Sequence, residues 1–90
     1  MVKTVIKRDS RRQAFSKAKI VGAVEKAARE ARVSSDKRRE YAREISEGVA
    51  KSLSRRSSVR SSEIRRRVLK RLESRSRAAV SAWKRHDRKR

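Results

Sequence analysis

The sequence predicts an α+β fold that is mostly α-helical, in which an N-terminal β-hairpin packs on a four-helix bundle. Strand-forming residues flank a charged turn near the start of the chain. Apolar residues then recur at helical spacing in successive segments, separated by serine-rich stretches that can cap helices. A chain of 90 residues without proline fits one domain, which we place at residues 1–90 with a basic tail over about residues 84–90.

The hairpin is expected in the first part of the chain. Residues 2–8 are rich in Val, Thr and Ile, which favour strands. Asp9 and Ser10 follow as the turn, because both side chains readily hydrogen-bond to nearby backbone. Residues 13–15 then form a short return strand.

The first helix is expected over about residues 17–31, with Ser16 as its N-cap. Apolar residues three and four apart place one side of this helix against a core. We expect Gly22 to weaken the helix slightly while allowing close packing. The apolar face consists of Ile20, Val24, Ala27, Ala28 and Ala31.

The second helix is expected over about residues 36–53, after the capping stretch 34–36. Its apolar residues recur at intervals of four, and the charged side chains cover the other faces. Residues 54–58, with the sequence SRRSS, have the composition of a loop. The apolar stripe consists of Tyr41, Ile45, Val49 and Leu53.

Two further helices complete the bundle. Residues 61–63 open the third helix with an acid in the first turn, where the helix dipole favours it. Ile64, Val68 and Leu72 form its apolar stripe. After a short break at residues 73–77, a last helix leads into the basic tail. The apolar residues of that helix are Ala79, Val80, Ala82 and Trp83.

Net charge is the most unusual feature of the chain. It has 30 Lys and Arg against 10 Asp and Glu, a formal net charge of +20. Such a surface repels itself unless a partner neutralises it, and Arg matches the geometry of phosphate oxygens. We therefore expect a non-enzymatic protein that binds nucleic acid. The expected phosphate-contacting residues are Arg11, Arg12, Arg55, Arg56, Arg66, Arg67, Lys70, Arg71, Arg75, Arg77, Lys84, Arg85, Arg88, Lys89 and Arg90.

Binding governed by charge and shape is favoured over base reading, since the chain has one Gln and no Asn. Phe15, Tyr41 and Trp83 fall on expected apolar faces, which favours core packing over base stacking. The partner is then structured RNA, as in a ribosome-associated protein, or duplex DNA, as in a nucleoid component. The sequence leaves this choice and the oligomeric state open. We expect a cytoplasmic protein, since the absence of Cys is consistent with an intracellular location. We expect no membrane partner, because no apolar run is long enough to span a bilayer and the apolar helix faces are needed for the core, although an anionic membrane surface stays an alternative.

No catalytic or metal site is expected. The chain has no Cys, which excludes disulfides, thiol catalysis and Cys-ligated zinc. His86, the one histidine, stands among basic residues without an obvious acid or nucleophile as partner. With two glycines in total, the chain also lacks a Gly-rich phosphate loop.

The opening of the chain resembles the ATP-cone domain family. That family begins with a strand, Lys-Arg-Asp-Gly, a return strand ending in Phe-Asp, and a helix starting near Lys-Ile. Residues 5–9, VIKRD, match the first half of this pattern, and residues 15–20, FSKAKI, match the second. Residues 59–64 resemble the start of the family's third helix, and residues 80–83 resemble its aromatic-bearing last helix. The resemblance covers nearly the whole chain and is most specific in its first thirty residues.

The resemblance implies an effector site for ATP or dATP. Members of the family act as allosteric switches, usually attached to ribonucleotide reductase or to a DNA-binding repressor. Carried over by position, Lys7, Arg8 and Lys19 face phosphates. Ser61 and Arg65 then lie near the base or sugar. The alternative function is therefore an ATP- or dATP-binding regulatory module that acts on a separate protein, and ATP is the ligand that the resemblance allows.

The sequence departs from the family pattern at several positions. Ser10 replaces the turn glycine, so a turn that needs a positive φ is strained here. Ser16 replaces the Asp before the first helix, although Ser caps helices equally well. Arg65 stands where one branch of the family has His.

Overall fold

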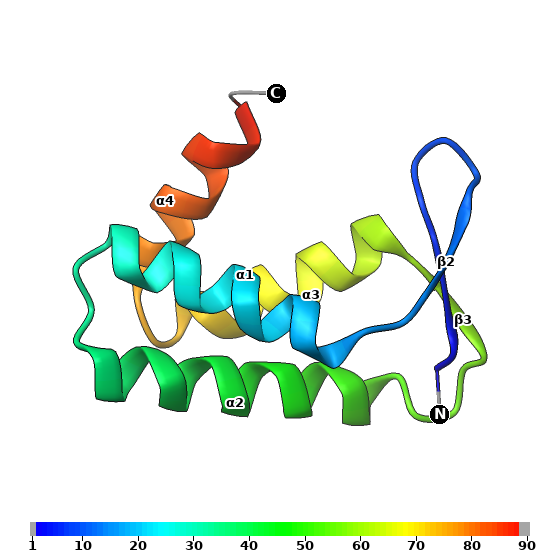
Figure 1. Cartoon of the computed structure of the whole chain (residues 1–90), viewed down its shortest axis with the longest axis horizontal. Coiled ribbons are helices and arrows are strands. Elements are labelled where there is room, and N and C mark those ends of the chain that lie inside the picture. Colours follow the sequence, from blue (N-terminus) through cyan, green and yellow to red (C-terminus); the bar gives the residue numbers. More distant parts are fainter. Residues whose placement is uncertain (1, 89–90) are drawn as a thin grey trace.

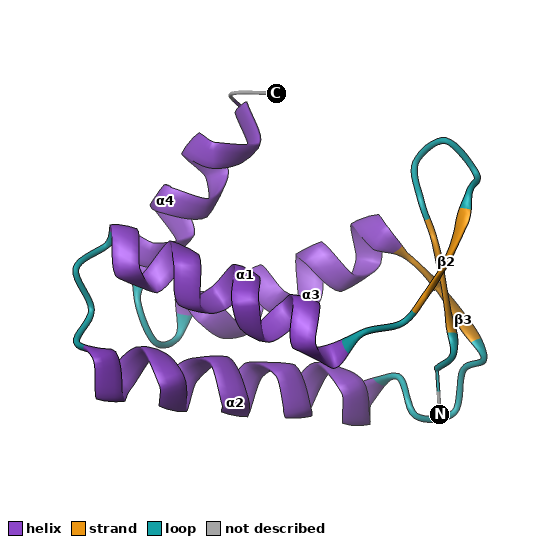
Figure 2. Ribbon diagram, in the orientation of Figure 1, coloured by secondary structure: helices purple, strands orange, loops and turns teal. Residues whose placement is uncertain are grey.

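The computed structural model describes residues 2–88 and places a small sheet at one end of a helical body (Figures 1 and 2). Four helices make up the body, so the expected α+β, mostly α class is confirmed. The elements in chain order are β1 (Thr4–Ile6), β2 (Arg12–Ala14), α1 (Lys17–Glu30), α2 (Ser35–Ser52), β3 (Ser58–Arg60), α3 (Ser61–Glu73) and α4 (Arg77–Arg88).

The predicted hairpin is confirmed, with β1 antiparallel to β2 and Val5 opposite Gln13. The N–H of Ser10 donates to the Lys7 carbonyl, and the N–H of Lys7 donates to the Arg11 carbonyl. Ser10 adopts a φ of 70°, the left-handed conformation in which glycine is favoured. The expectation that Ser10 occupies a turn position suited to glycine is thus confirmed.

A third strand, β3, lies parallel to β1 and makes the strand order β2-β1-β3. This strand is not predicted by the sequence, in which residues 54–58 have the composition of a loop, whereas Ser58 already pairs with Thr4. Val59 lies opposite Val5 in this pair and is buried. A strand of three residues is too short to show alternation, and a parallel partner so distant along the chain leaves no local pattern.

Serine hydroxyls cap the first two helices as predicted. The Ser16 hydroxyl accepts from the Lys19 N–H at 3.3 Å, and Ser34 does the same for Lys37 at 3.4 Å. At the other end of α1, Arg32 takes a φ of 63°. The N–H groups beyond Ala31 bond back to carbonyls of the last turn, which is the Schellman arrangement.

Helix α3 begins directly after β3, with Arg60 at the capping position and no side-chain cap. The break before α4 covers only residues 74–76, and the Ser76 hydroxyl accepts from the Ala79 N–H at 3.1 Å. Helix α4 continues to Arg88, as Figure 2 shows. Most of the expected basic tail is therefore the last turn and a half of a helix, because nothing in it breaks helical geometry.

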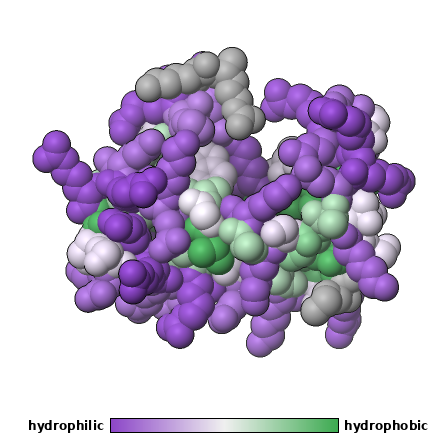
Figure 3. Space-filling view, viewed as in Figure 1, coloured by the Kyte–Doolittle hydropathy of each residue, from purple (hydrophilic) through white to green (hydrophobic). Residues whose placement is uncertain are grey.

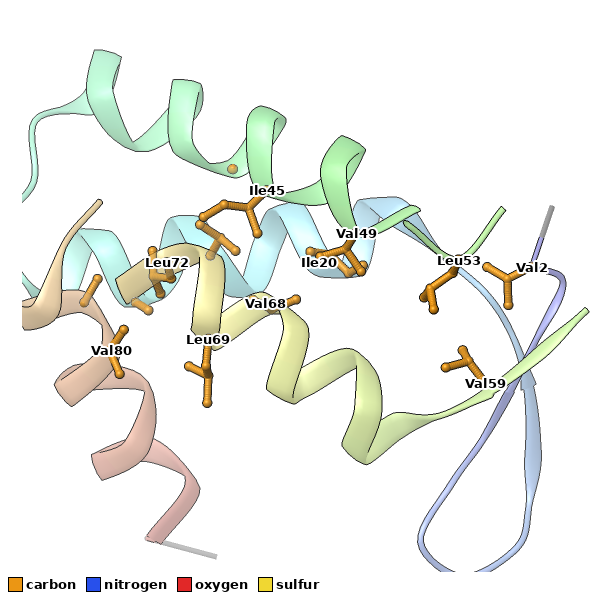
Figure 4. Close-up of a cluster of buried hydrophobic side chains, with 14 residues drawn as sticks. Val2, Ile20, Ile45, Val49, Leu53, Val59, Val68, Leu69, Leu72 and Val80 are labelled. Carbon is orange, nitrogen blue, oxygen red and sulfur yellow. The ribbon is translucent and has the colours of Figure 1, made fainter. Parts of the chain in front are cut away.

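The core lies between the helices and extends to the sheet (Figure 4). Helix α1 packs on α2 and α4, and α3 packs on the same two helices. Val2, Leu53 and Val59 join the sheet to the end of α2. Gly22 is exposed, with no atom near the place a Cβ would occupy, so the expected close packing there is wrong.

Candidate functional site

A cleft of about 240 Å³ opens where the hairpin, α1, α3 and α4 meet. Its apolar lining comes from all four elements or the segments beside them, and cationic side chains stand around it. The principal apolar residues are Phe15, Ile20, Ile64, Val68 and Trp83, and the principal polar ones are Lys7, Ser16, Lys19, Ser61, Arg65 and Asp87. The cleft thus combines an apolar floor with several positive charges.

Most of the residues predicted to contact a nucleotide come together in this cleft. Lys7, Lys19, Ser61 and Arg65 all line it, although Lys7 and Arg65 are far apart in the sequence. The sheet explains the convergence, because β3 runs beside β1 and leads straight into α3. Arg8 lies outside the cleft, in an open hollow of about 400 Å³ at the hairpin turn that Lys7 also lines.

Asp87 is a cleft residue that the sequence analysis did not identify. Its Oδ2 accepts from both Nε and Nη2 of Arg65, each at 2.6 Å, and so ties α4 to α3. Both side chains remain partly exposed. The sequence placed Asp87 in a tail, and only the helical spacing between Trp83 and Asp87 could have put it on the same face as a cleft residue.

The cleft presents aromatic surface and positive charge side by side. Half-buried Phe15 and Trp83 offer aromatic surface to a planar base, while Lys7 and Lys19 offer ammonium groups to phosphates. The cleft alone is smaller than the roughly 300–1,000 Å³ of ordinary ligand pockets. The hollow at the hairpin turn adjoins it through Lys7 and provides room for a phosphate chain.

Among the described residues, those predicted to contact nucleic acid divide into three groups: residues that line a second cavity, residues engaged within the protein, and other exposed residues. Three of them, Arg66, Lys70 and Lys84, line a second and larger cavity of about 710 Å³ between α3 and α4. Arg60 and Arg65 line the same cavity. We call it the α3–α4 groove, and its position beside the cleft follows from Arg65, which lines both.

Several other predicted contacts are engaged within the protein. Arg56 and Arg67 both bond to Glu63, Arg75 bonds to Glu44, and Arg11 bonds to Asp9. Arg71 lays its guanidinium against Gly48 of α2, with Nη1 2.7 Å from the place a Cβ would occupy. The remaining predicted cations among the described residues are exposed, namely Arg12 on β2, Arg55 after α2, and Arg77, Arg85 and Arg88 on α4. Lys89 and Arg90 lie outside the described residues.

Glu63 is the carboxylate around which the start of α3 is organised. Arg56 donates to its Oε2 at 2.5 Å and Arg67 donates to the same oxygen at 3.0 Å. Hydrogen bonds from Arg56 and then from Arg67 hold the pKa of Glu63 below its usual range. Glu63 is therefore ionised at neutral pH and forms ion pairs with Arg56 and Arg67 at the wall of the groove.

The surface seen in Figure 3 is mostly hydrophilic, with hydrophobic patches between projecting polar side chains. Within residues 2–88, no cluster of His, Asp and Glu is arranged to hold a metal ion. Across the same residues, none of the helices has the length and apolar character needed to cross a membrane.

The ATP cone domain family model matches residues 3–89 of the chain. The match includes every cleft residue described above and nearly the whole fold. A comparison with curated proteins finds no match.

Proposed function

The chain belongs to the ATP cone domain family, and from this premise we propose that it binds a nucleoside triphosphate such as ATP or dATP in the cleft. The observation that carries the proposal is the convergence of Lys7, Lys19, Ser61 and Arg65 on one cleft with an apolar floor. These residues come from the hairpin, α1 and α3, so their meeting depends on the whole fold.

In this proposal, different residues of the cleft contact different parts of the nucleotide. Lys7 and Lys19 contact the phosphates, because an ammonium group provides three donors and a full charge. The base lies against the aromatic floor near Trp83, and Ser61 lies close to the sugar. Arg8 reaches the phosphates from the hollow at the turn, which Lys7 shares.

Binding without chemistry is the role that this site supports. ATP cone domains by themselves are regulatory and not catalytic, and nothing in the cleft pairs a nucleophile with a general base. We place the protein in the cytoplasm, where the bound nucleotide changes how it interacts with a separate partner molecule. The nucleotide acts as an effector and is released without having reacted.

Isothermal titration calorimetry with ATP, dATP and GTP at moderate salt tests this function. We expect saturable binding with a preference for adenine. The variant Lys19→Ala should weaken ATP binding about tenfold, since a charge-assisted hydrogen bond contributes on the order of 1.5–3 kcal/mol. Lys17→Ala is the matched control, because Lys17 is exposed on the same helix and does not line the cleft. Equal losses in the two variants, or no ATP binding by the native protein, would contradict the proposal.

A second candidate function is binding of nucleic acid, either structured RNA or duplex DNA. The observation that favours it is the distribution of ion pairs among residues 2–88. Acidic residues engage Arg56, Arg67 and Arg75, whereas Arg66, Lys70 and Lys84 form no ion pair among these residues. Uncompensated charge of this density favours a polyanion. Fluorescence anisotropy with labelled RNA and DNA tests it, and no binding at low salt would exclude it.

A further inference from the structure

The α3–α4 groove has a volume of about 710 Å³ and is lined by residues of α3 and α4 and by Arg60. Figure 1 shows α4 pointing away from the other helices. Leu69 and Val80 contribute to its apolar base, and charged side chains of both helices form its walls. It is wider and more charged than the neighbouring cleft, and an aromatic residue is absent from its lining.

The charges in the groove do not balance. Arg60, Arg66, Lys70 and Lys84, which we call the groove cations, form no ion pair within residues 2–88. Of the two carboxylates in its walls, Glu63 is already held by Arg56 and Arg67. That leaves Glu73 as the one carboxylate of the groove without an ion pair in this part of the chain, facing four cations.

The groove cations are spaced along an axis. Arg66 and Lys70 are four residues apart on α3, so they stand on one face about 6 Å apart along the helix axis. Lys84 faces the same cavity from α4. Successive phosphates on one strand of a duplex rise by about 3.4 Å along the axis, and the winding of the strand places them farther apart than that in space. A row of cations with this spacing therefore suits neighbouring phosphates of one strand.

The lining favours a duplex over a single strand. Proteins that hold single strands stack bases on exposed aromatic side chains, and no aromatic residue lines this groove. Among the described residues, Ser62 is the only uncharged polar side chain in the lining, and Asn and Gln, which read adenine, are absent from it. Apart from its carboxylates, the groove therefore offers one side-chain acceptor to the O–H of a 2′-hydroxyl. Phosphates are what its long cationic side chains fit best.

We infer that the α3–α4 groove docks the phosphate backbone of duplex DNA, with Arg60, Arg66, Lys70 and Lys84 contacting phosphates without reading sequence. The inference rests on the second candidate function, nucleic-acid binding, and assigns it a surface and a partner. It is separate from nucleotide binding in the cleft.

The test measures fluorescence anisotropy of a labelled 20-base-pair DNA duplex with the full chain at several salt concentrations. The groove variant is Lys70→Glu with Lys84→Glu. The matched control is Lys37→Glu with Arg39→Glu, an equal charge change at exposed positions of α2, on the opposite side of the body from α4 (Figure 1). Circular dichroism checks that both variants keep their helices. An RNA duplex and a single-stranded DNA of the same sequence serve as competing ligands.

We expect the groove variant to lose at least tenfold in DNA affinity relative to the control at about 100 mM salt, because two phosphate contacts become repulsive. Its plot of log affinity against log salt should be shallower by about 2, since each lost phosphate contact removes about 0.9 from the slope. This pair of results supports the inference.

Other results would overturn it, and they differ from one another. If the native chain binds DNA and both variants lose affinity equally, nucleic-acid binding stands and the groove assignment falls. Tighter binding of the RNA duplex or of the single strand removes duplex DNA as the partner. If the native chain binds none of the three ligands at about 50 mM salt, the second candidate function itself fails, and the inference fails with it.

Discussion

The cleft and the α3–α4 groove are neighbours that share Arg65, yet they differ in what surrounds their charges. In the cleft, the cations stand around an apolar floor that includes Trp83. In the groove, four cations face one carboxylate that has no ion pair within residues 2–88, and the cavity is nearly three times larger. For this reason we propose different ligands for similar basic side chains, a compact nucleotide in the cleft and an extended polyanion in the groove.

The difference also separates two origins of the positive charge. The cations of the cleft lie within the residues that the ATP cone family model matches, and we propose that nucleotide phosphates account for them. The groove cations are not explained by the nucleotide, because they line a different cavity.

Salt concentration should separate the two surfaces most strongly. If each of the four groove cations neutralises one phosphate, the slope of log affinity against log salt is about −3.6, and DNA affinity falls roughly hundredfold between about 50 and 200 mM salt. ATP lacks the condensed counterions of a polymer, so its affinity should fall less than tenfold. Parallel titrations by anisotropy and calorimetry measure both slopes. Equal slopes for the two ligands would show that they use one surface.

The turn beside the cleft should respond to a smaller change. Ser10 has a φ of 70°, and a left-handed residue other than glycine carries a cost of about 1–2 kcal/mol. Ser10→Gly should raise the free energy of unfolding by about 0.5–1 kcal/mol, after the greater entropy of glycine in the unfolded chain is subtracted. Urea unfolding measures it.

Arg32→Gly is the matched control for the turn, because Arg32 has a φ of 63° at the end of α1. It should stabilise the protein by a similar amount, about 0.5–1 kcal/mol, and leave ATP affinity unchanged, since Arg32 lines neither cavity. A loss of stability in Ser10→Gly would mean that the serine side chain contributes more than its backbone strain costs.

The helices could be predicted from the sequence because their signals are local. Ser16 and Ser34 stand at caps, and the apolar spacing from Ile20 to Val24 and from Ile45 to Val49 defines the buried faces. The cleft was predicted only through a family resemblance, since Lys7 and Arg65 become neighbours through a parallel strand pair that has no local signal.

The sequence predicted most of the basic residues of the groove but not the cavity that they line. The basic residues of α3 were identified from their number, whereas their separation into paired and unpaired cations depends on where Glu63 lies in space. Its two partners come from a loop and from the next turn of α3, and sequence spacing shows only the second.

Low pH should reduce the contribution of Glu63 to the free energy of unfolding. Its pKa is lowered in the folded protein by the hydrogen bonds from Arg56 and Arg67, so its contribution to stability is present above the pKa of the unfolded chain. That contribution is lost as pH falls through the folded-state value. Glu63→Gln should therefore be less stable than the native protein at pH 7, and the difference should shrink in acid. Urea unfolding at pH 7 and about pH 3 measures it.

Glu63→Gln should also affect the DNA affinity of the groove and the ATP affinity of the cleft differently. Removing the Glu63 charge frees Arg56 and Arg67 beside the groove, so DNA affinity at pH 7 should rise while ATP affinity stays constant. A difference in stability that grows toward low pH would reverse the sign of the linkage and contradict the ion-pair assignment.

The smallest expected effect concerns Asp87, which lines the cleft and pairs with Arg65, the residue that lines both cavities. Asp87→Asn removes the charge that holds Arg65, and because both side chains are partly exposed the stability cost should be about 0.2–1 kcal/mol. ATP affinity should rise by less than tenfold, since the carboxylate repels phosphates from the cleft wall. Glu73→Gln, in the groove alone, should raise DNA affinity and leave ATP affinity unchanged. If Asp87→Asn instead lowers ATP affinity, then Asp87 accepts a hydrogen bond from the nucleotide, and Arg65 serves to position that carboxylate rather than to contact the ligand.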